Sequence, residues 1–150
     1  MKITIVGSGH VGLVTGICFA EIGHQILCVD NDVEKLETLR KGEVPFYEPG
    51  VERLLHKHLK SKRLALTDSI QKGVRESNVI FIAVGTPPRP NGEADLSYVE
   101  TVSREIAKAM TGYRLIVEKS TVPVETGEWV RRTVRQSIKR KIPFDVASNP

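Results

Sequence analysis

Short apolar runs of strand length alternate along this chain with longer segments whose apolar residues recur at helical spacing. Parallel strands need crossover connections, usually helices, so this alternation predicts a parallel sheet with helices on both faces. The run at 78–84 is almost unbroken in apolar residues, as expected for a central strand buried on both sides. Strands are predicted at 3–6, 25–29, 64–66, 78–84, 115–117 and 144–147, and helices at 11–22, 32–40, 51–59, 97–110 and 126–139, with a short helix that begins near 68–69. We therefore expect one doubly wound α/β domain over residues 1–150, built on a six-stranded parallel sheet.

The composition is that of an ordinary globular domain. Apolar residues make up 40% of the 150 residues and charged residues 27%, which excludes disordered and collagen-like chains. No apolar run reaches eighteen residues, so no membrane-spanning helix is expected. Cys18 and Cys28 are too few for a disulfide framework, and their places in a predicted helix and strand suggest that both are buried. A reducing, cytoplasmic setting fits best.

The net charge of +4 has a local origin. The stretch 128–141 carries six basic residues and one acid, and 53–63 carries five basic residues and no acid. Both are predicted to be mainly solvated helix surfaces, and 131–141 contains no aromatic residue of the kind that stacks on bases. We therefore expect no nucleic-acid partner. We also expect no metal site, because His56 and His58 have no third ligand at suitable spacing.

The segment after the first predicted strand matches the pattern G-x-G-x-x-G. Gly7 would permit a tight turn, Gly9 a close approach of the backbone to a pyrophosphate, and Gly12 close packing of helix on strand. His10 and Val11 lie in the same loop, at the start of the predicted helix. Its free N–H groups and dipole would favour an anion there, so the spacing indicates a dinucleotide site.

An acidic residue ends the second predicted strand at the position that this kind of site requires. Asp30 lies eighteen residues after Gly12, where a carboxylate can accept the ribose hydroxyls of adenosine and repel a 2′-phosphate. This favours NAD over NADP as the cofactor. Lys35, one turn into the next helix, would either approach the same ribose or pyrophosphate or lie on a solvated face. Asn31 is the expected N-cap of that helix.

Two further polar loops follow predicted strands at the same edge of the sheet. The first contains Val84, Gly85 and Thr86, and the second contains Ser120 and Thr121. Ligands of open parallel sheets bind beyond the carboxyl ends of the strands, so these loops are candidates to hold the nicotinamide half of the cofactor with hydroxyls and open backbone N–H groups. The alternative is ordinary turn chemistry.

In order along the chain, these and other motifs resemble those of the UDP-glucose/GDP-mannose dehydrogenase family. The matching blocks are 7–13, 42–50, 84–87, 95–99, 119–124 and 148–150. The resemblance implies a Rossmann-type domain that contacts NAD through Val11, Asp30, Lys35, Thr86 and Thr121. It implies further that Thr121 lies near the reacting carbon and helps to hold a catalytic water. His10 departs from the pattern, since the family usually has tyrosine there.

The activity implied by this resemblance is two successive NAD-dependent oxidations that convert UDP-glucose to UDP-glucuronate, a precursor in polysaccharide biosynthesis. The family's second oxidation proceeds through a thioester on a catalytic cysteine, and neither cysteine of this chain matches that motif. By the same resemblance, the nucleophilic cysteine and the other catalytic residues would lie beyond Pro150, the last residue of the 148–150 block.

We therefore expect this chain, on its own, to bind NAD but not to oxidise the sugar. The intact enzyme is expected to be a homo-oligomer that binds a UDP-sugar, with its central and C-terminal substrate domains outside these 150 residues. The alternatives are a dehydrogenase for UDP-N-acetylmannosamine or GDP-mannose, or a non-catalytic nucleotide-binding module.

Overall fold

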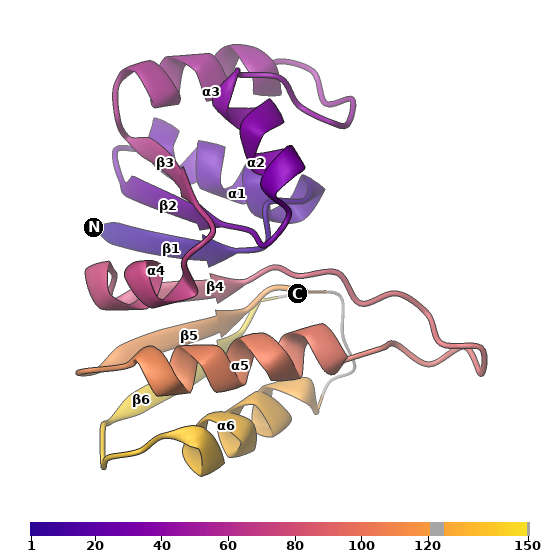
Figure 1. The fold of residues 1–150 in the computed structure, drawn as a ribbon, viewed down its shortest axis with the longest axis vertical. Coiled ribbons are helices and arrows are strands. Elements are labelled where there is room, and N and C mark those ends of the chain that lie inside the picture. Colours follow the sequence, from indigo (N-terminus) through magenta and orange to yellow (C-terminus); the bar gives the residue numbers. More distant parts are fainter. Residues whose placement is uncertain (121–124, 150) are drawn as a thin grey trace.

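The chain folds around one six-stranded parallel sheet (Figure 1). The computed structural model describes residues 1–120 and 125–149. The strands are β1 (Lys2–Val6), β2 (Gln25–Val29), β3 (Leu64–Thr67), β4 (Val79–Ile82), β5 (Arg114–Glu118) and β6 (Phe144–Ser148). The helices are α1 (His10–Glu21), α2 (Val33–Arg40), α3 (Val51–Lys60), α4 (Ile70–Glu76), α5 (Ser97–Ala109) and α6 (Thr126–Ser137). The doubly wound parallel sheet predicted from the sequence is confirmed, with element bounds that differ by a few residues.

The strand order is β3-β2-β1-β4-β5-β6, so the chain winds outward in both directions from the centre. β1 pairs in parallel with β2 on one side and with β4 on the other, in register from Ile3 opposite Val79 to Val6 opposite Ile82. The connections therefore diverge above the carboxyl ends of β1 and β4, where ligands of such sheets bind. The long loop between β4 and α5 projects from this same side (Figure 1), closed by an isolated antiparallel bridge between Pro88 and Ala94.

Two apolar cores lie on opposite faces of the sheet. On one face, α1 and α3 pack on the sheet through residues such as Leu13, Ile17 and Leu55, all at most 1% exposed. On the other face, α4, α5 and α6 cover it with residues such as Ile106 and Val130. The strands are buried between these helix layers, which explains their nearly continuous apolar sequences.

Two expectations about single residues were wrong here, and one was right. Asn31 does not cap α2, because Asp32 occupies the N-cap and its side chain accepts the N–H of Lys35 at 3.0 Å. Cys18 is exposed on the outer side of α1, although the prediction had placed it in the core. Cys28 is buried as expected, and burial together with the Asp30 carboxylate raises the pKa of its thiol to about 12.

His58 was expected on an exposed helix face but is 2% exposed. Its Nε2 lies 2.7 Å from Oε2 of Glu21, and Lys57 donates to the other oxygen of the same carboxylate at 2.6 Å. This pair of contacts joins α3 to the end of α1. Val130 and Val134 of α6 face the core and are fully buried, whereas Ile138, which was expected on the same face, is the C-cap of α6 and only half-buried.

The tight turn between β1 and α1 depends on two of its glycines. Gly7 has a φ of 101°, and a Cβ there would lie 2.5 Å from the carbonyl oxygen of Ala83, the residue directly after β4. A Cβ at Gly12 would overlap the carbonyl oxygen of Gly7. Both glycines are therefore required by the fold itself, because the start of α1 lies directly against the ends of β1 and β4.

These contacts predict that Gly12→Ala destabilises the domain by about 2–3 kcal/mol. The new methyl group would clash with the backbone carbonyl of Gly7, and a movement of side chains cannot relieve this clash. Gly9→Ala is the matched control in the same loop. Gly9 has an ordinary φ of −71°, and no described atom lies within 4 Å of the position that a Cβ would take there. Urea unfolding of the wild type and the two variants measures the difference, and equal stability of both variants would contradict this view of the loop.

Candidate functional site

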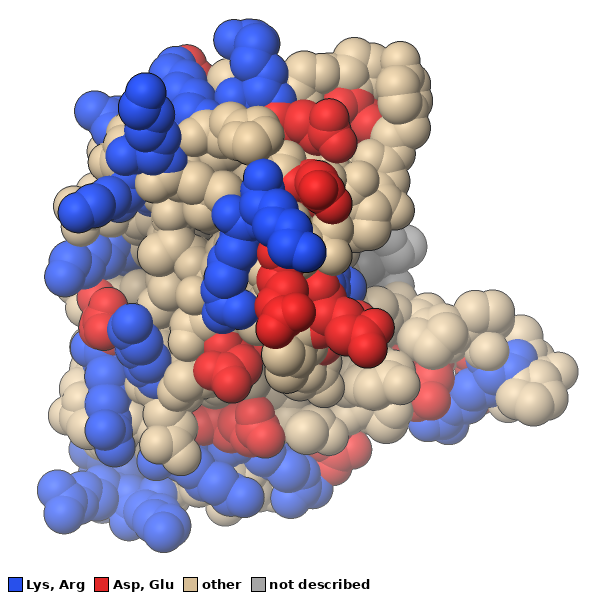
Figure 2. Space-filling view, turned by 45° about the horizontal axis from the view of Figure 1, so that its top comes forward, with Lys and Arg blue, Asp and Glu red and all other residues tan. Residues whose placement is uncertain are grey.

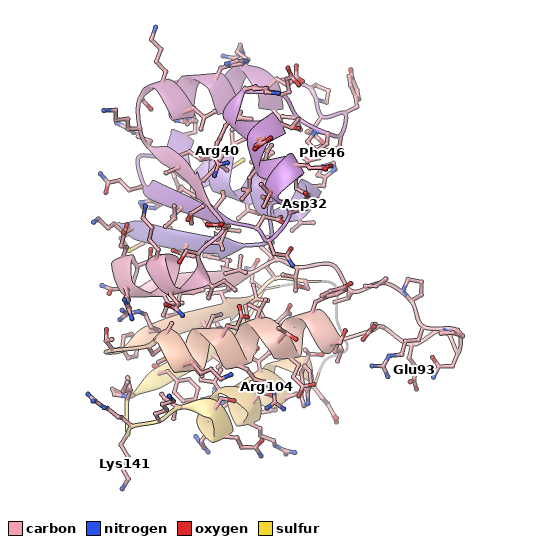
Figure 3. The ribbon with its side chains drawn as sticks, viewed as in Figure 1. Asp32, Arg40, Phe46, Glu93, Arg104 and Lys141 are labelled. Carbon is pink, nitrogen blue, oxygen red and sulfur yellow. The ribbon has the colours of Figure 1, made fainter. Side chains whose placement is uncertain are left out.

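A cleft of about 680 Å³ opens at the carboxyl ends of β1, β2 and β4. Figure 3 labels Asp32 and Phe46 on this side of the molecule and Lys141 at the opposite end. Six of the residues proposed from the sequence line the cleft together, namely Gly7, Gly9, Asp30, Lys35, Val84 and Gly85. The fold thus brings the glycine loop, the acid after β2 and the loop after β4 into one concave surface.

Gly9 provides open space at the floor of this cleft. It is the N-cap of α1, and no side chain caps the helix there. The first turn of α1 contains no acidic residue, so no side chain of that turn offers an anion to its N–H groups or to the positive end of its dipole. The absence of a side chain at Gly9 leaves these groups accessible. This arrangement suits a phosphate or pyrophosphate.

Asp30 is 7% exposed and receives four hydrogen bonds. Its Oδ2 accepts the backbone N–H of Ser8 at 2.8 Å, the Ser8 hydroxyl at 2.7 Å and the ammonium of Lys35 at 3.1 Å. Its Oδ1 accepts the N–H of Asp32 at 3.0 Å. Burial by itself raises the pKa of the Asp30 carboxyl, but these bonds outweigh it and hold the pKa below its usual range. Asp30 is therefore ionised at neutral pH, and Oδ1 keeps capacity for a further donor from the cleft.

The sequence left open whether Lys35 approaches the cofactor or lies on a solvated helix face, and the structure shows features of both. Its ammonium binds Asp30 and lies 3.9 Å from Asp32, and 28% of the side chain is exposed in the cleft. The lysine therefore faces the site and neutralises part of its acidity. Asp68 and Glu105 add two more acids to the cleft wall, so the surroundings of Asp30 are on balance acidic.

The His10 side chain turns toward the segment before α3. Its ring stacks on Phe46 with 4.5 Å between the ring centroids and 11° between the planes, and its Nε2 lies 3.0 Å from Oε2 of Glu48. His10 thereby fastens the 43–50 segment to the start of α1, beside the cleft but outside its lining. Val11 is 47% exposed on the same turn, and Gly12 is buried beneath it.

The loop after β5 was expected to present open backbone N–H groups, but the N–H groups of Lys119 and Ser120 are already bonded within the protein. The N–H of Ser120 donates to Oε1 of Glu118 at 2.6 Å, and the N–H of Lys119 donates to the carbonyl of Ile82 at 2.9 Å. Thr86 follows the cleft-lining Gly85 in the loop after β4.

Two of the sequence predictions fall on positions that the structure does not describe. Thr121, the predicted catalytic and cofactor residue, lies outside the described residues. Pro150 also lies outside them. The structure therefore tests neither the role given to Thr121 nor the expectation that the remaining catalytic residues would lie beyond Pro150, and both stay predictions.

Several residues of the site were not found from the sequence. Ser8 holds Asp30, and Tyr98, Thr101 and Glu105 of α5 line the cleft. The place of Ser8 between two motif glycines was the only signal for it. Among the α5 residues only Tyr98 had a signal, its place in the matching block 95–99, because helical spacing marks the core-facing neighbours and not the rim of a ligand site.

The rest of the described surface offers other features. A second hollow lies at the opposite edge, between α6 and β6, and is lined by basic and apolar side chains of 135–144. Across residues 1–120 and 125–149, no cluster of three or more His, Cys, Asp or Glu is placed to hold a metal ion. No helix within those ranges is long and apolar enough to span a membrane.

The bonds at Asp30 predict a pH-dependent contribution to stability. A carboxyl whose folded pKa is depressed stabilises the fold above its unfolded pKa, near 3.8, and loses that contribution as pH falls through the folded value. Asp30→Asn should therefore lower the free energy of unfolding by about 2 kcal/mol at pH 7 and by less at pH 3. Asp32→Asn is the control, because asparagine caps a helix as well as aspartate does. Chemical denaturation at both pH values tests this, and a loss in Asp30→Asn that does not change with pH would contradict it.

Comparison with known proteins gives a consistent result. The profile described as "UDP-glucose/GDP-mannose dehydrogenase family, NAD binding domain" matches residues 1–150. The chain is 47% identical over 149 residues to the UDP-glucose 6-dehydrogenase TuaD of Bacillus subtilis, covering 99% of this chain and 32% of that protein. It is 48% identical over 151 residues to the UDP-glucose 6-dehydrogenase of Rhizobium meliloti, covering all of this chain and 34% of that protein. The chain thus spans about a third of the length of these relatives.

Solved structures agree. A UDP-glucose dehydrogenase from Pyrobaculum islandicum superposes with a TM-score of 0.94 at 40% identity, over 99% of this chain and 35% of that one. A ternary complex of GDP-mannose dehydrogenase from Pseudomonas aeruginosa superposes with a TM-score of 0.95 at 37% identity. The match covers 100% of this chain and 36% of that one. With the match of the family profile along its whole length, this chain belongs to the UDP-glucose/GDP-mannose dehydrogenase family, in which it corresponds to the NAD binding domain.

Proposed function

We propose that residues 1–150 form the cofactor domain of an NAD-dependent UDP-glucose 6-dehydrogenase. The observation that carries the cofactor assignment is the space at Gly9. Gly7 and Gly12 are glycines because the fold requires them, whereas neither backbone conformation nor packing among the described residues requires a glycine at position 9. A ligand that approaches the backbone at the start of α1 explains this residue.

The proposed pose follows the polar groups of the cleft. The pyrophosphate lies at the N-terminus of α1 above Gly9, with Gly7, Val11 and Gly12 shaping the loop. The adenosine ribose donates to Oδ1 of Asp30, beside Lys35. The nicotinamide half extends over Val84, Gly85 and Thr86 toward Ser120 and Thr121. Bound there, NAD would supply a hydride acceptor. His10 would act on the rim, by holding Phe46 and Glu48 beside the pyrophosphate.

The acidity of the cleft supports NAD over NADP. The Asp30 carboxylate is held ionised, and Asp32, Asp68 and Glu105 line the same cleft. A 2′-phosphate on the ribose would bring about two further negative charges next to these carboxylates, with Lys35 already engaged by Asp30. Such like-charge contacts are costly when they are partly desolvated.

The whole reaction belongs to the proposal as well. By similarity to the relatives named UDP-glucose 6-dehydrogenase, the intact enzyme would oxidise UDP-glucose to UDP-glucuronate with two molecules of NAD, and would work as a cytoplasmic homo-oligomer in polysaccharide precursor synthesis. A second candidate is a dehydrogenase for a different nucleotide sugar, which the good superposition on a GDP-mannose dehydrogenase supports. Residues 1–150 contain no cysteine at the family's catalytic motif, so this chain by itself should bind NAD and leave UDP-glucose unoxidised.

Calorimetric titration with NAD and NADP tests the proposal. We expect NAD to bind at least ~10-fold more tightly than NADP, since the 2′-phosphate meets the acidic cleft. Gly9→Ala should weaken NAD binding ~10-fold or more while it leaves the unfolding transition unchanged, because its methyl group occupies the space of a phosphate.

The matched control is Gly112→Ala in the turn before β5, at the opposite end of the strands. A Cβ there would lie 3.8 Å from a guanidinium nitrogen of Arg114, an ordinary van der Waals contact, so neither fold nor cofactor should respond. No binding of either dinucleotide by the wild-type chain would refute the proposed function, and tighter binding of NADP would refute the role of Asp30.

A further inference from the structure

The structure contains a second buried carboxyl group at the cofactor edge, and it differs from Asp30. Glu118 is the last residue of β5 and is 1% exposed. Among the described residues its donors come from Ser120, whose backbone N–H reaches Oε1 at 2.6 Å. Its other oxygen, Oε2, is buried without a hydrogen-bond partner in the part of the chain that the structure describes. Asp30, by contrast, receives four donors that include the ammonium of Lys35.

The surroundings of Glu118 offer it little compensating charge. Ile82 on β4 and Ser148 on β6 lie opposite it in register, and both are uncharged. The first turn of α6 lies above these strand ends, since a Cβ at Gly127 would be 4.0 Å from the Cβ of Ser148. In that turn the Thr126 hydroxyl is also buried without a partner among the described residues.

The charged side chains of the neighbouring loop and helices are Glu100, Arg104 and Glu105 of α5, Lys119 beside Glu118, and Glu125, Glu128 and Arg131 at the start of α6. Glu105 lines the cleft. Lys119 is the one that favours ionisation of Glu118, but its ammonium binds Oδ1 of Asn149 at 3.0 Å. Glu100 pairs with Arg104, and Glu128 pairs with Arg131 on the exposed side of α6.

An ionised carboxylate in this position would lose its hydration without an equivalent set of donors, which costs far more than burying a neutral acid. Burial accordingly raises the pKa of Glu118 above its usual value, against the smaller opposing effects of Ser120 and Lys119. The carbonyl-type oxygen of a neutral acid still accepts the Ser120 N–H. That bond fixes the backbone of Ser120 directly after the end of β5.

We propose that Glu118 is a positioning residue of the NAD site, which holds the backbone of Ser120 directly after β5 as a neutral carboxylic acid. This role rests on the proposed function, which places Ser120 beside the nicotinamide half of the cofactor. Glu118 itself is fully covered and would touch neither cofactor nor substrate. Glutamine at this position retains both the shape and the acceptor oxygen, whereas alanine removes the acceptor.

The test is calorimetric titration of the chain with NAD for Glu118→Gln and Glu118→Ala. At pH 7 we expect Glu118→Gln to stay within ~2-fold of the wild-type dissociation constant and Glu118→Ala to raise it ~10-fold, the effect of one buried hydrogen bond left unmade. Glu128→Gln, which neutralises an exposed carboxylate with 68% of its side chain accessible, is the control and should bind NAD as the wild type does.

A pH series separates positioning from simple packing. A carboxyl whose folded pKa is raised stabilises the fold fully below its unfolded pKa, near 4.5, and loses that contribution as pH rises through the folded value. If the neutral acid is the form that supports binding, ionisation of Glu118 weakens NAD binding by the wild type but not by Glu118→Gln, so the ratio of the wild-type dissociation constant to that of Glu118→Gln should rise with pH. This comparison needs no truncated side chain, so it decides the question even if Glu118→Ala does not fold.

Three results would overturn the proposal. Glu118→Ala could bind NAD as tightly as the wild type, Glu118→Gln could bind as weakly as Glu118→Ala, or the ratio could fall with rising pH, which would make the carboxylate the binding form. A wild-type chain that binds no NAD would instead overturn the proposed function of the domain. The two failures are thus distinguishable.

Discussion

The carboxylate of Asp30 fastens the glycine loop to the end of β2, and the geometry of the cofactor edge depends on this attachment. Ser8, between two glycines of the loop, gives both its N–H and its hydroxyl to Asp30, while Lys35 approaches from α2. Gly7 and Gly12 allow the same loop to lie against β4 and α1 without a clash. The start of α1 is thereby fixed with its N–H groups facing the cleft, and the acid that would recognise a ribose is fixed beside it.

The two edges of the sheet differ in charge. Figure 2 shows Lys and Arg gathered along the left and lower margins of the molecule, the side where the strands begin in Figure 1, and Asp and Glu nearer the middle. The cleft has four acidic residues and one lysine in its lining, whereas Arg135, Lys139, Arg140 and Lys141 line the hollow at the other edge. The helix dipole of α6 favours cations near its C-terminus, so this basic surface is consistent with an ordinary solvated helix end. The excess positive charge therefore lies away from the dinucleotide cleft.

Periodicity in the sequence was sufficient for the sheet, its helices and the glycine loop, because these follow from local burial patterns and from the needs of a tight turn. It was insufficient where a polar side chain meets a partner far along the chain. His58 is buried because Glu21, 37 residues away, accepts its bond. Asp30 was identified from its spacing, but its hold on Ser8 required the assembled fold. Glu118 lay outside the strand predicted at 115–117, and its burial with an oxygen that has no partner among the described residues depends on the assembled fold. Cys18 lies outside the core because α1 turns only its other face to the sheet.

We expect NAD to lie across the carboxyl edge of the sheet with its pyrophosphate at the start of α1. Amide chemical-shift mapping of the isotope-labelled chain during titration with NAD tests this most directly. The account predicts shifts that concentrate at residues 7–12, at Asp30 and Lys35, and at 84–86, with little change at 135–144. Shifts that concentrate around the basic hollow at 135–144, with the glycine loop unaffected, would contradict it.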